Sequence, residues 1–200
     1  MMLFGPDFSE LPDCELTYIP DFLGAEKADV LFQSLLKEVP WQEDTITVFG
    51  KTYNQPRLTA LYGEAGKVYT YSGISMHPHP FTPDLEELRQ LVAEKSGATF
   101  SSVLLNLYRN GQDSNGWHAD NEAELGNHPT IASVSLGAAR YFHLKHRHRK
   151  DLRIKVLLEP GSLLVMAGAT QQYWLHQIPK TARPVEARIN LTFRNILGAD

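Results

Sequence analysis

Apolar residues recur with helical spacing in two segments of the chain. The first covers residues 25–39, where Val30, Leu31, Leu35 and Leu36 form an apolar stripe. Residues three or four positions apart lie on one face of an α-helix, so this pattern predicts an amphipathic helix that packs against a core.

The second predicted helix is marked at both ends by residues that favour helix boundaries. Thr82 can cap the N-terminus with its hydroxyl, Pro83 suits the first helical position, and Gly97 suits the end of the last turn. The apolar face between these boundaries consists of Leu85, Leu88 and Val92.

Beyond Gly97 the chain changes to short β-type runs separated by turns. The runs cover residues 101–108, 131–137, 140–146, 152–159, 161–168 and 187–194. Their length and spacing are typical of a sandwich or barrel, so we predict an α+β, mainly β fold with a jelly-roll core. Residues 1–96 are then an N-terminal α/β extension of the same domain, and residues 97–200 are the core. Within the extension, residues 45–71 look extended, with a hairpin turn at Phe49, Gly50 and Lys51.

Composition and charge narrow the class of protein. A chain of 200 residues that is 42% hydrophobic suits one globular domain. The net charge of -4 excludes a general attraction to nucleic acid, so such binding would need a local basic patch. The single cysteine, Cys14, excludes an intramolecular disulfide, and there is no secretory signal and no apolar run of about 18 residues. We therefore expect a soluble, monomeric intracellular protein, cytoplasmic in a bacterium or nuclear in a eukaryote, with no membrane partner.

Two of the β runs carry polar residues on one face only. In residues 101–108, Asn106 and Tyr108 share a face that alternates with apolar residues. In residues 187–194 the polar face consists of Arg188, Asn190, Thr192 and Arg194. Such a face either lines a polar pocket inside a barrel or is exposed to solvent. The planar guanidinium of arginine favours a pocket, because it binds a carboxylate through two hydrogen bonds.

The segment NGWHADNE carries a candidate metal-binding pair. His118 and Asp120 are two residues apart, so they share a face of an extended segment. The pair alone is common by chance, and His176 is the candidate for a third ligand. Two histidines and one carboxylate form the facial triad of non-haem Fe(II) oxygenases, which leaves positions open for a cosubstrate and oxygen. A keto acid would chelate the iron, and an arginine of residues 187–194 could bind its distal carboxylate.

Together these motifs resemble the AlkB family of Fe(II)/2-oxoglutarate dioxygenases, over about residues 49–196. The resemblance is greatest to the branch that repairs alkylated DNA, which comprises AlkB homologues 2 and 3 and bacterial relatives. It is carried by the stretches PRLTALYGEAGKVYTYSG, LLNLYRNGQDSNGWHADNE, PTIASVSLGAAR, GSLLVMAG and ARINLTFR. The resemblance implies a double-stranded β-helix core, with Fe(II) as cofactor, 2-oxoglutarate as cosubstrate and O2 as oxidant.

The resemblance also implies roles for individual residues. The ligands of Fe(II) would be His118, Asp120 and His176. The residues that hold 2-oxoglutarate would be Asn106, Tyr108, Arg188, Asn190, Thr192 and Arg194. Arg188 would take the distal carboxylate, and it joins the three metal ligands in the implied catalytic set.

Further residues are implied to contact the substrate. They are Phe49, Gly50, Lys51, Arg57, Tyr69, Tyr71 and Asn121. In this branch an aromatic residue on a hairpin probes the duplex and fills the gap left by a flipped base, and Phe49 occupies that place. Asn121 stands where the repair relatives carry an acidic residue, and Glu122 is the nearest alternative carboxylate.

The predicted function is oxidative demethylation of N-alkylated bases in DNA, namely 1-methyladenine and 3-methylcytosine. Alternatives are the same chemistry on RNA or on a protein or lipid, a damage sensor without catalysis, and a zinc hydrolase that uses the same three ligands. The basic run of residues 143–155 favours nucleic acid if it contacts phosphates, although a solvated hairpin tip has the same composition.

Overall fold

The computed structural model describes residues 6–48, 51–71 and 74–197. Within these ranges the helical elements are α1 (Ala25–Glu38), α2 (Pro83–Ser96), the 3-10 turn η1 (Ala123–Leu125) and α3 (Thr170–Tyr173). The strands are β1 (Glu15–Ile19), β2 (Thr45–Val48), β3 (Lys51–Asn54), β4 (Leu58–Gly63), β5 (Tyr69–Tyr71), β6 (Ile74–Met76), β7 (Ser102–Tyr108), β8 (Asn115–His118), β9 (Ile131–Gly137), β10 (Arg140–His146), β11 (Arg153–Leu158), β12 (Leu163–Ala167), β13 (Trp174–Ile178) and β14 (Arg188–Arg194). The chain is therefore mainly β, as the sequence predicts.

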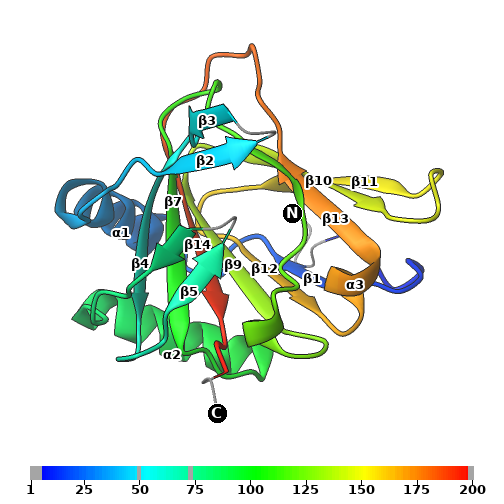
Figure 1. The fold of residues 1–200 in the computed structure, drawn as a ribbon, viewed down its shortest axis with the longest axis horizontal. Helices are drawn as coiled ribbons and strands as arrows, with labels where there is room; N and C mark the ends of the chain where they lie inside the picture. The colour runs from blue at the N-terminus through cyan, green and yellow to red at the C-terminus, as the bar shows by residue number, and fades with distance from the viewer. Residues whose placement is uncertain (1–5, 49–50, 72–73, 198–200) are drawn as a thin grey trace.

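Two antiparallel sheets face each other and form the predicted jelly roll. Within the described residues, the larger sheet has six strands in the order β1-β12-β9-β14-β7-β4, and the smaller has four in the order β11-β10-β13-β8. α1 and α2 cover the face of the larger sheet that points away from β10, β11 and β13 (Figure 1). The interior thus has two regions, one between the helices and the larger sheet and one between the two sheets.

Strand pairing joins the N-terminal extension to the core. β1 pairs with β12 and β4 pairs with β7, so two strands from residues 1–96 form the edges of the larger sheet. β2 and β3 pair with Val48 opposite Lys51, and they form the arms of the predicted hairpin. Its turn, Phe49 and Gly50, lies outside the described residues. The extension and the core therefore share one sheet.

α1 lies in the predicted range, but it buries a different face. Its buried side chains are those of Ala28, Leu31 and Leu35, which are three and four residues apart. Val30 is 67% exposed and Leu36 is 37% exposed, so the predicted stripe is wrong at these two positions. The apolar residues cover a wider part of the helix surface than the part that packs against the larger sheet. The packing against the sheet therefore decides which of these residues are buried.

α2 confirms the helix boundaries read from the sequence. The hydroxyl of Thr82 accepts a hydrogen bond from the backbone N–H of Leu85 at 3.3 Å, and Gly97 ends the helix in the left-handed conformation with φ 67°. The buried face consists of Leu85, Leu88 and Val92. Among the described residues, no helix is both long enough and apolar enough to cross a membrane.

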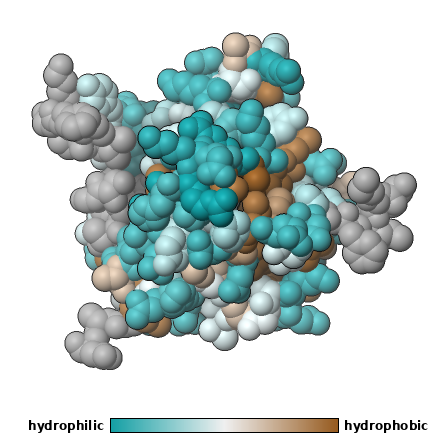
Figure 2. Space-filling view, turned by 90° about the vertical axis from the view of Figure 1, so that its right-hand side faces the viewer, coloured by the Kyte–Doolittle hydropathy of each residue, from teal (hydrophilic) through white to brown (hydrophobic). Residues whose placement is uncertain are grey.

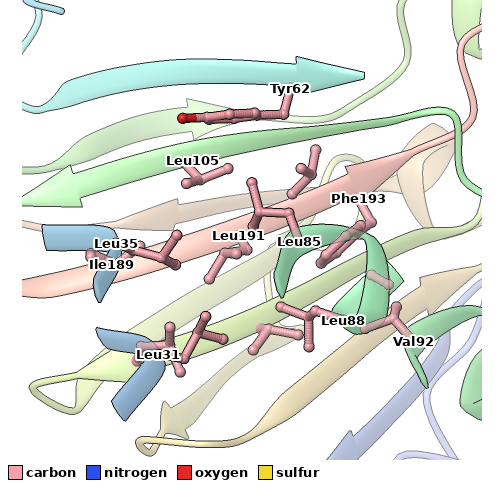
Figure 3. Close-up of a cluster of buried hydrophobic side chains, with 14 of the residues drawn as sticks. Leu31, Leu35, Tyr62, Leu85, Leu88, Val92, Leu105, Ile189, Leu191 and Phe193 are labelled. Carbon is pink, nitrogen blue, oxygen red and sulfur yellow. The ribbon is translucent and has the colours of Figure 1, made fainter. Parts of the chain in front are cut away.

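The central strands β7, β9 and β14 divide their side chains between the two interior regions. Towards the helices they present only apolar side chains, namely Val103, Leu105, Leu107, Ala132, Val134, Leu136, Ile189, Leu191 and Phe193. Figure 3 shows Leu105, Leu191 and Phe193 in one cluster with Leu85 of α2. The opposite faces of the same strands point between the two sheets and carry the polar residues, so the predicted alternation is confirmed.

The burial pattern of α1 can be tested by replacing each of two adjacent leucines by alanine in separate variants. Leu35→Ala should lower the free energy of unfolding by about 2–5 kcal/mol, because it deletes buried methyl groups and leaves a cavity. Leu36→Ala should cost no more than about 1 kcal/mol, because its side chain is partly exposed. Urea denaturation of both variants measures the difference, and equal losses would contradict the assigned face.

Candidate active site

A polar pocket lies between the two sheets. Its polar lining from the larger sheet consists of Asn106, Tyr108, Ser133, Asn190, Thr192 and Arg194. The smaller sheet contributes His118 and His176, and Arg57 and Asp120 come from adjoining loops. The candidate metal ligands and the polar residues of the two β faces therefore meet in one cavity, except that Arg188 is not among the lining residues.

Three side chains with metal-ligand chemistry come together in this pocket. His118 ends β8 and lies opposite His176 of β13, and Asp120 follows β8 by two residues. One ligand atom of each residue lies within 4.8 Å of the others. The Nε2 atoms of the two histidines are 3.1 Å apart, and Nε2 of His176 is 3.5 Å from Oδ2 of Asp120. The structure thus brings together all three residues predicted as a facial triad.

Neighbouring groups orient these ligands. Nδ1 of His118 is 2.7 Å from the backbone carbonyl of Gly116. A carbonyl only accepts hydrogen bonds, so Nδ1 carries the proton and Nε2 presents its lone pair to the cluster. The backbone N–H of Asp120 donates to Oε1 of Gln171 at 2.9 Å, and Nη2 of Arg194 donates to Oδ1 of Asp120 at 2.6 Å. Such outer contacts fix ligand geometry in metal sites.

The ionisation of the cluster suits a divalent cation. Burial lowers the pKa of His118 and brings the pKa of His176 to about 3, so both imidazoles are neutral at neutral pH. Burial alone would raise the pKa of Asp120, but the Arg194 guanidinium holds it well below its usual range. Metal ligands must be deprotonated, and two neutral imidazoles with one carboxylate are a donor set that fits Fe(II).

Three of the four polar residues of β14 are buried and Asn190 is partly buried, which excludes the solvent-exposed alternative. Arg188 is 0% exposed, Arg194 5% and Thr192 7%. β14 is paired on both edges, with β7 on one side and β9 on the other. Serine hydroxyl groups of β9 accept some of the hydrogen bonds that these side chains donate. For example, Nδ2 of Asn190 donates to Oγ of Ser133 at 2.7 Å.

Arg188 has unused hydrogen-bonding capacity in the interior. Its Nη2 donates to Oγ of Ser135 at 3.0 Å, and its Cζ lies 5.3 Å from the centre of the Tyr108 ring. Within the described part of the chain, its Nε and Nη1 have no hydrogen-bond partner. Burial lowers the pKa of Arg188 to about 10, so the side chain remains a cation at neutral pH. Burying a cation whose N–H groups lack acceptors is energetically unfavourable unless an anion binds to it. The distal carboxylate of 2-oxoglutarate has the charge and the two oxygen acceptors that Arg188 lacks.

Two residues predicted to contact the substrate lie beside these groups. Arg57 is buried, and its Nε donates to Oδ1 of Asn106 at 2.8 Å. Tyr69 is fully buried, with its ring centre 5.0 Å from Cζ of Arg194. Arg57 therefore lines the pocket itself, and Tyr69 packs against Arg194, which lines it.

Asn121 and Glu122, the two residues that follow the metal-binding aspartate, differ in burial. The side chain of Asn121 is exposed, whereas Glu122 is partly buried. Burial and the charge of Asp120 raise the pKa of the Glu122 carboxyl. Glu122 is thus the more buried of the two residues, and it lies close enough to Asp120 for the two carboxyl groups to interact electrostatically. Phe49 and Gly50, with the side chains of Lys51 and Tyr71, lie outside the described residues, so their contacts stay predictions.

Three residues that support the site were not expected from the sequence. Ser133 and Ser135 alternate with apolar residues in β9, and this period of two could have revealed a third polar face. Gln171 lies on the four-residue helix α3 and reaches Asp120 across the fold. No local pattern marks it, because only the chain path places α3 beside that loop.

The basic run of residues 143–155 forms a hairpin between β10 and β11. The exposed residues at its tip are Arg147, His148, Arg149, Lys150 and Asp151, and Arg149 forms an ion pair with Asp151 at 3.4 Å. Figure 2 looks towards this hairpin, and hydrophilic surface gathers near the centre of that view. His146 is buried, accepts hydrogen bonds at Nδ1 from two backbone N–H groups of the turn, and lies 3.3 Å from Asp13. It therefore holds the turn in place.

Comparison with known proteins agrees with this geometry. The family model described as the 2OG-Fe(II) oxygenase superfamily matches residues 15–194. The "Alpha-ketoglutarate-dependent dioxygenase alkB homolog 3" of Bos taurus is 44% identical over 186 residues, which cover 88% of this chain and 64% of the relative. The chain thus spans somewhat less than two thirds of that relative.

A second relative matches over more of its own length. The "DNA oxidative demethylase ALKBH2" of Homo sapiens is 40% identical over 195 residues, which cover 92% of this chain and 74% of the relative. The solved structure of OsALKBH1 has the same fold, with a TM-score of 0.65 at 16% identity, over 90% of this chain and 96% of that one. The chain therefore belongs to the 2OG-Fe(II) oxygenase superfamily and, within it, to the AlkB family.

Proposed function

We propose that this protein is an oxidative demethylase that repairs N-alkylated bases in DNA, with 1-methyladenine and 3-methylcytosine as substrates. One observation carries the proposal. The His-Asp-His cluster shares an interior with Arg188, two of whose donor atoms have no partner among the described residues. A metal cluster alone serves many reactions, but a cluster combined with a buried carboxylate-binding arginine suits a dicarboxylate that chelates iron. The substrate class comes from the relative named as a DNA oxidative demethylase.

The metal would be held by His118, Asp120 and His176. When bound with 2-oxoglutarate and O2, Fe(II) supplies the oxidation: the N-methyl group gains a hydroxyl and leaves as formaldehyde, while 2-oxoglutarate becomes succinate and CO2. The protein keeps its ligands deprotonated and oriented. Arg194 engages Oδ1 of Asp120, which leaves Oδ2 for the metal.

The cosubstrate would lie along the polar faces of β7 and β14. Arg188 would take the distal carboxylate with its Nε and Nη1, and the ring of Tyr108 packs against the same guanidinium. Asn106, Asn190 and Thr192 line the same pocket and offer amide and hydroxyl groups to the rest of the molecule. Because these faces are buried, water is kept from competing for the same hydrogen bonds.

The damaged base would enter between Tyr69, Arg57 and Glu122. A base must leave the stack to reach a buried metal site, and this is least costly when its methyl group already prevents Watson–Crick pairing. Glu122 adjoins Tyr69 and can accept a hydrogen bond from an exocyclic amine of the base. We therefore assign base recognition to Glu122 in place of the exposed Asn121.

DNA would be bound mainly through its phosphates. The tip of the β10–β11 hairpin concentrates exposed cations on a protein whose net charge is -4. The hairpin of β2 and β3, with Phe49 at its turn, would probe the duplex, as the family resemblance implies. A DNA substrate places the protein in the cytoplasm of a bacterium or the nucleus of a eukaryote, and a monomer suffices for this arrangement.

The alternative functions each leave a part of the site without a purpose. A zinc hydrolase has no use for the unpaired donors of Arg188. A damage sensor without catalysis needs neither the metal ligands nor that arginine. A methylated base in RNA would use the same pocket. An assay with both RNA and DNA oligonucleotides is therefore needed to decide which of the two is the substrate.

The activity itself is tested with defined oligonucleotides. Protein loaded anaerobically with Fe(II) and 2-oxoglutarate and then given O2 should demethylate DNA that contains 1-methyladenine or 3-methylcytosine, with release of succinate and formaldehyde. Mass spectrometry follows all products. The control Asp120→Ala should abolish turnover, because it removes a metal ligand, and should leave DNA affinity unchanged. Succinate without demethylation would move the substrate to RNA or another molecule, and no succinate from folded, iron-loaded protein would refute the dioxygenase.

The role of Arg188 predicts a selective loss of cosubstrate binding. Arg188→Ala should raise the KM for 2-oxoglutarate by at least about thirtyfold, the cost of deleting one partner of a buried charge pair. The matched control is Arg89→Ala. Arg89 lies on α2 and hydrogen-bonds to Glu86, so its loss should leave this KM unchanged. Steady-state kinetics at saturating DNA measures both variants. An unaltered KM in Arg188→Ala would remove that residue from the cosubstrate site.

The basic hairpin predicts a change in salt dependence. Replacing Arg147, Arg149 and Lys150 together by glutamine should weaken DNA binding for every sequence and reduce the slope of log K against log salt by about 2–3. The control variant replaces Lys27, Lys37 and Lys95 by glutamine. It removes the same number of positive charges, but from α1 and α2. Equal slopes in the two triple variants would show that the hairpin is only a solvated loop.

A further inference from the structure

Arg140 is a buried arginine to which none of the roles above has been given. It begins β10 and is 4% exposed. Its Nη1 donates to the backbone carbonyl of Asn110 at 3.2 Å. Its Nη2 donates to the backbone carbonyls of Asp113 at 3.1 Å and of Pro179 at 2.6 Å. One guanidinium therefore bridges the loop between β7 and β8 and the loop between β13 and β14.

These two loops connect the strands that form the pocket. The first loop follows Tyr108, the last residue of β7, and leads into β8, which ends at His118. The second loop follows β13, which carries His176, and leads to Arg188, the first residue of β14. A shift of either loop would move the end of a strand that carries a residue of the site.

The loops are packed too closely to slide freely against each other. The backbone N–H of Thr181 donates to the carbonyl of Gly111 at 2.8 Å. A Cβ on Gly111 would lie only 2.5 Å from the carbonyl oxygen of Thr181. Arg140 donates hydrogen bonds to carbonyls of both loops, so it stabilises the contact between them.

The positive charge of Arg140 is not neutralised by a carboxylate. Its hydrogen-bond acceptors within the described residues are backbone carbonyls. The carboxylate of Asp113 is engaged by Arg109, whose Nε and Nη2 donate to it at 2.8 and 3.0 Å. The ring of Tyr108 lies 5.9 Å from Cζ of Arg140 and 5.3 Å from Cζ of Arg188. Two buried cations thus contact one aromatic ring, that of Tyr108, which lines the pocket.

We propose that Arg140 is a positioning residue for the distal carboxylate of the cosubstrate, because its fork of three carbonyl contacts holds Tyr108 and Arg188 in the geometry that binds this group. The inference rests on the proposed function, which makes the cosubstrate a dicarboxylic 2-oxo acid. Three of the four N–H groups on the Nη atoms of Arg140 donate to backbone carbonyls, so its role is to hold the two loops and not to bind the carboxylate. Lysine cannot replace it, because an ammonium group lacks the planar fork that reaches both loops.

Binding of two 2-oxo acids tests this role without turnover. 2-Oxoglutarate and 2-oxopentanoate, which has the same chain without the distal carboxylate, are titrated into anaerobic Mn(II)-loaded protein. Arg140→Met and Arg140→Lys should each raise the Kd of 2-oxoglutarate by about tenfold or more, as the loss of supporting contacts does in metal sites. The Kd of 2-oxopentanoate and the Kd of Mn(II) should stay unchanged. Arg89→Met, which removes another arginine bonded to a backbone carbonyl, should change none of these constants.

The outcomes separate positioning from general packing. A folded Arg140 variant that binds 2-oxoglutarate as tightly as the wild type overturns the proposal, and so does an equal loss for both acids. Gly111→Ala, which crowds the same junction without changing charge, is the second variant if the Arg140 variants do not fold. It should weaken 2-oxoglutarate alone, and unchanged binding would again refute the role. Wild-type protein that binds no 2-oxoglutarate would refute the proposed function itself.

Discussion

The alternation of side chains along β14, a strand paired on both edges, is the constraint on which the site depends. With β7 and β9 bonded to its two edges, β14 cannot rotate or slip without breaking both ladders. Its apolar residues must then face the helices, and its polar residues must face the space between the sheets. Burying two arginines in this way is favourable only if their charges find partners.

Arg194 and Arg188 meet that requirement in different ways. Arg194 is paired within the protein, with Nη2 at 2.6 Å from Oδ1 of Asp120. The pair ties the central strand to the loop that carries a metal ligand, so the position of the ligand is coupled to the register of the sheet. Arg188 has no such carboxylate among the described residues, and under the proposed function the distal carboxylate of the cosubstrate would be its partner.

The pocket therefore has two ends that are stabilised by different contacts. At the metal end, the pairing of β8 with β13 sets His118 opposite His176, and Gln171 fixes the backbone of Asp120. At the other end, Tyr108 contacts the guanidinium of Arg188, and the two loops beyond them are clamped to each other through backbone carbonyls. Under the proposed function, substitutions at the two places would then perturb metal binding and carboxylate binding separately.

The sequence by itself determined the local features: the boundaries of α2, the short β runs of the core, the two faces of β7 and β14, and the family motifs. These features follow from periodicity, capping and turn chemistry, which act between near neighbours in the chain. Only the tertiary structure decided which part of the α1 stripe is buried, that β1 and β4 complete the larger sheet, and that Glu122 is more buried than Asn121. The same holds for Gln171 and Arg140, whose partners are distant in sequence. Such contacts depend on strand register and chain path, which no local pattern specifies.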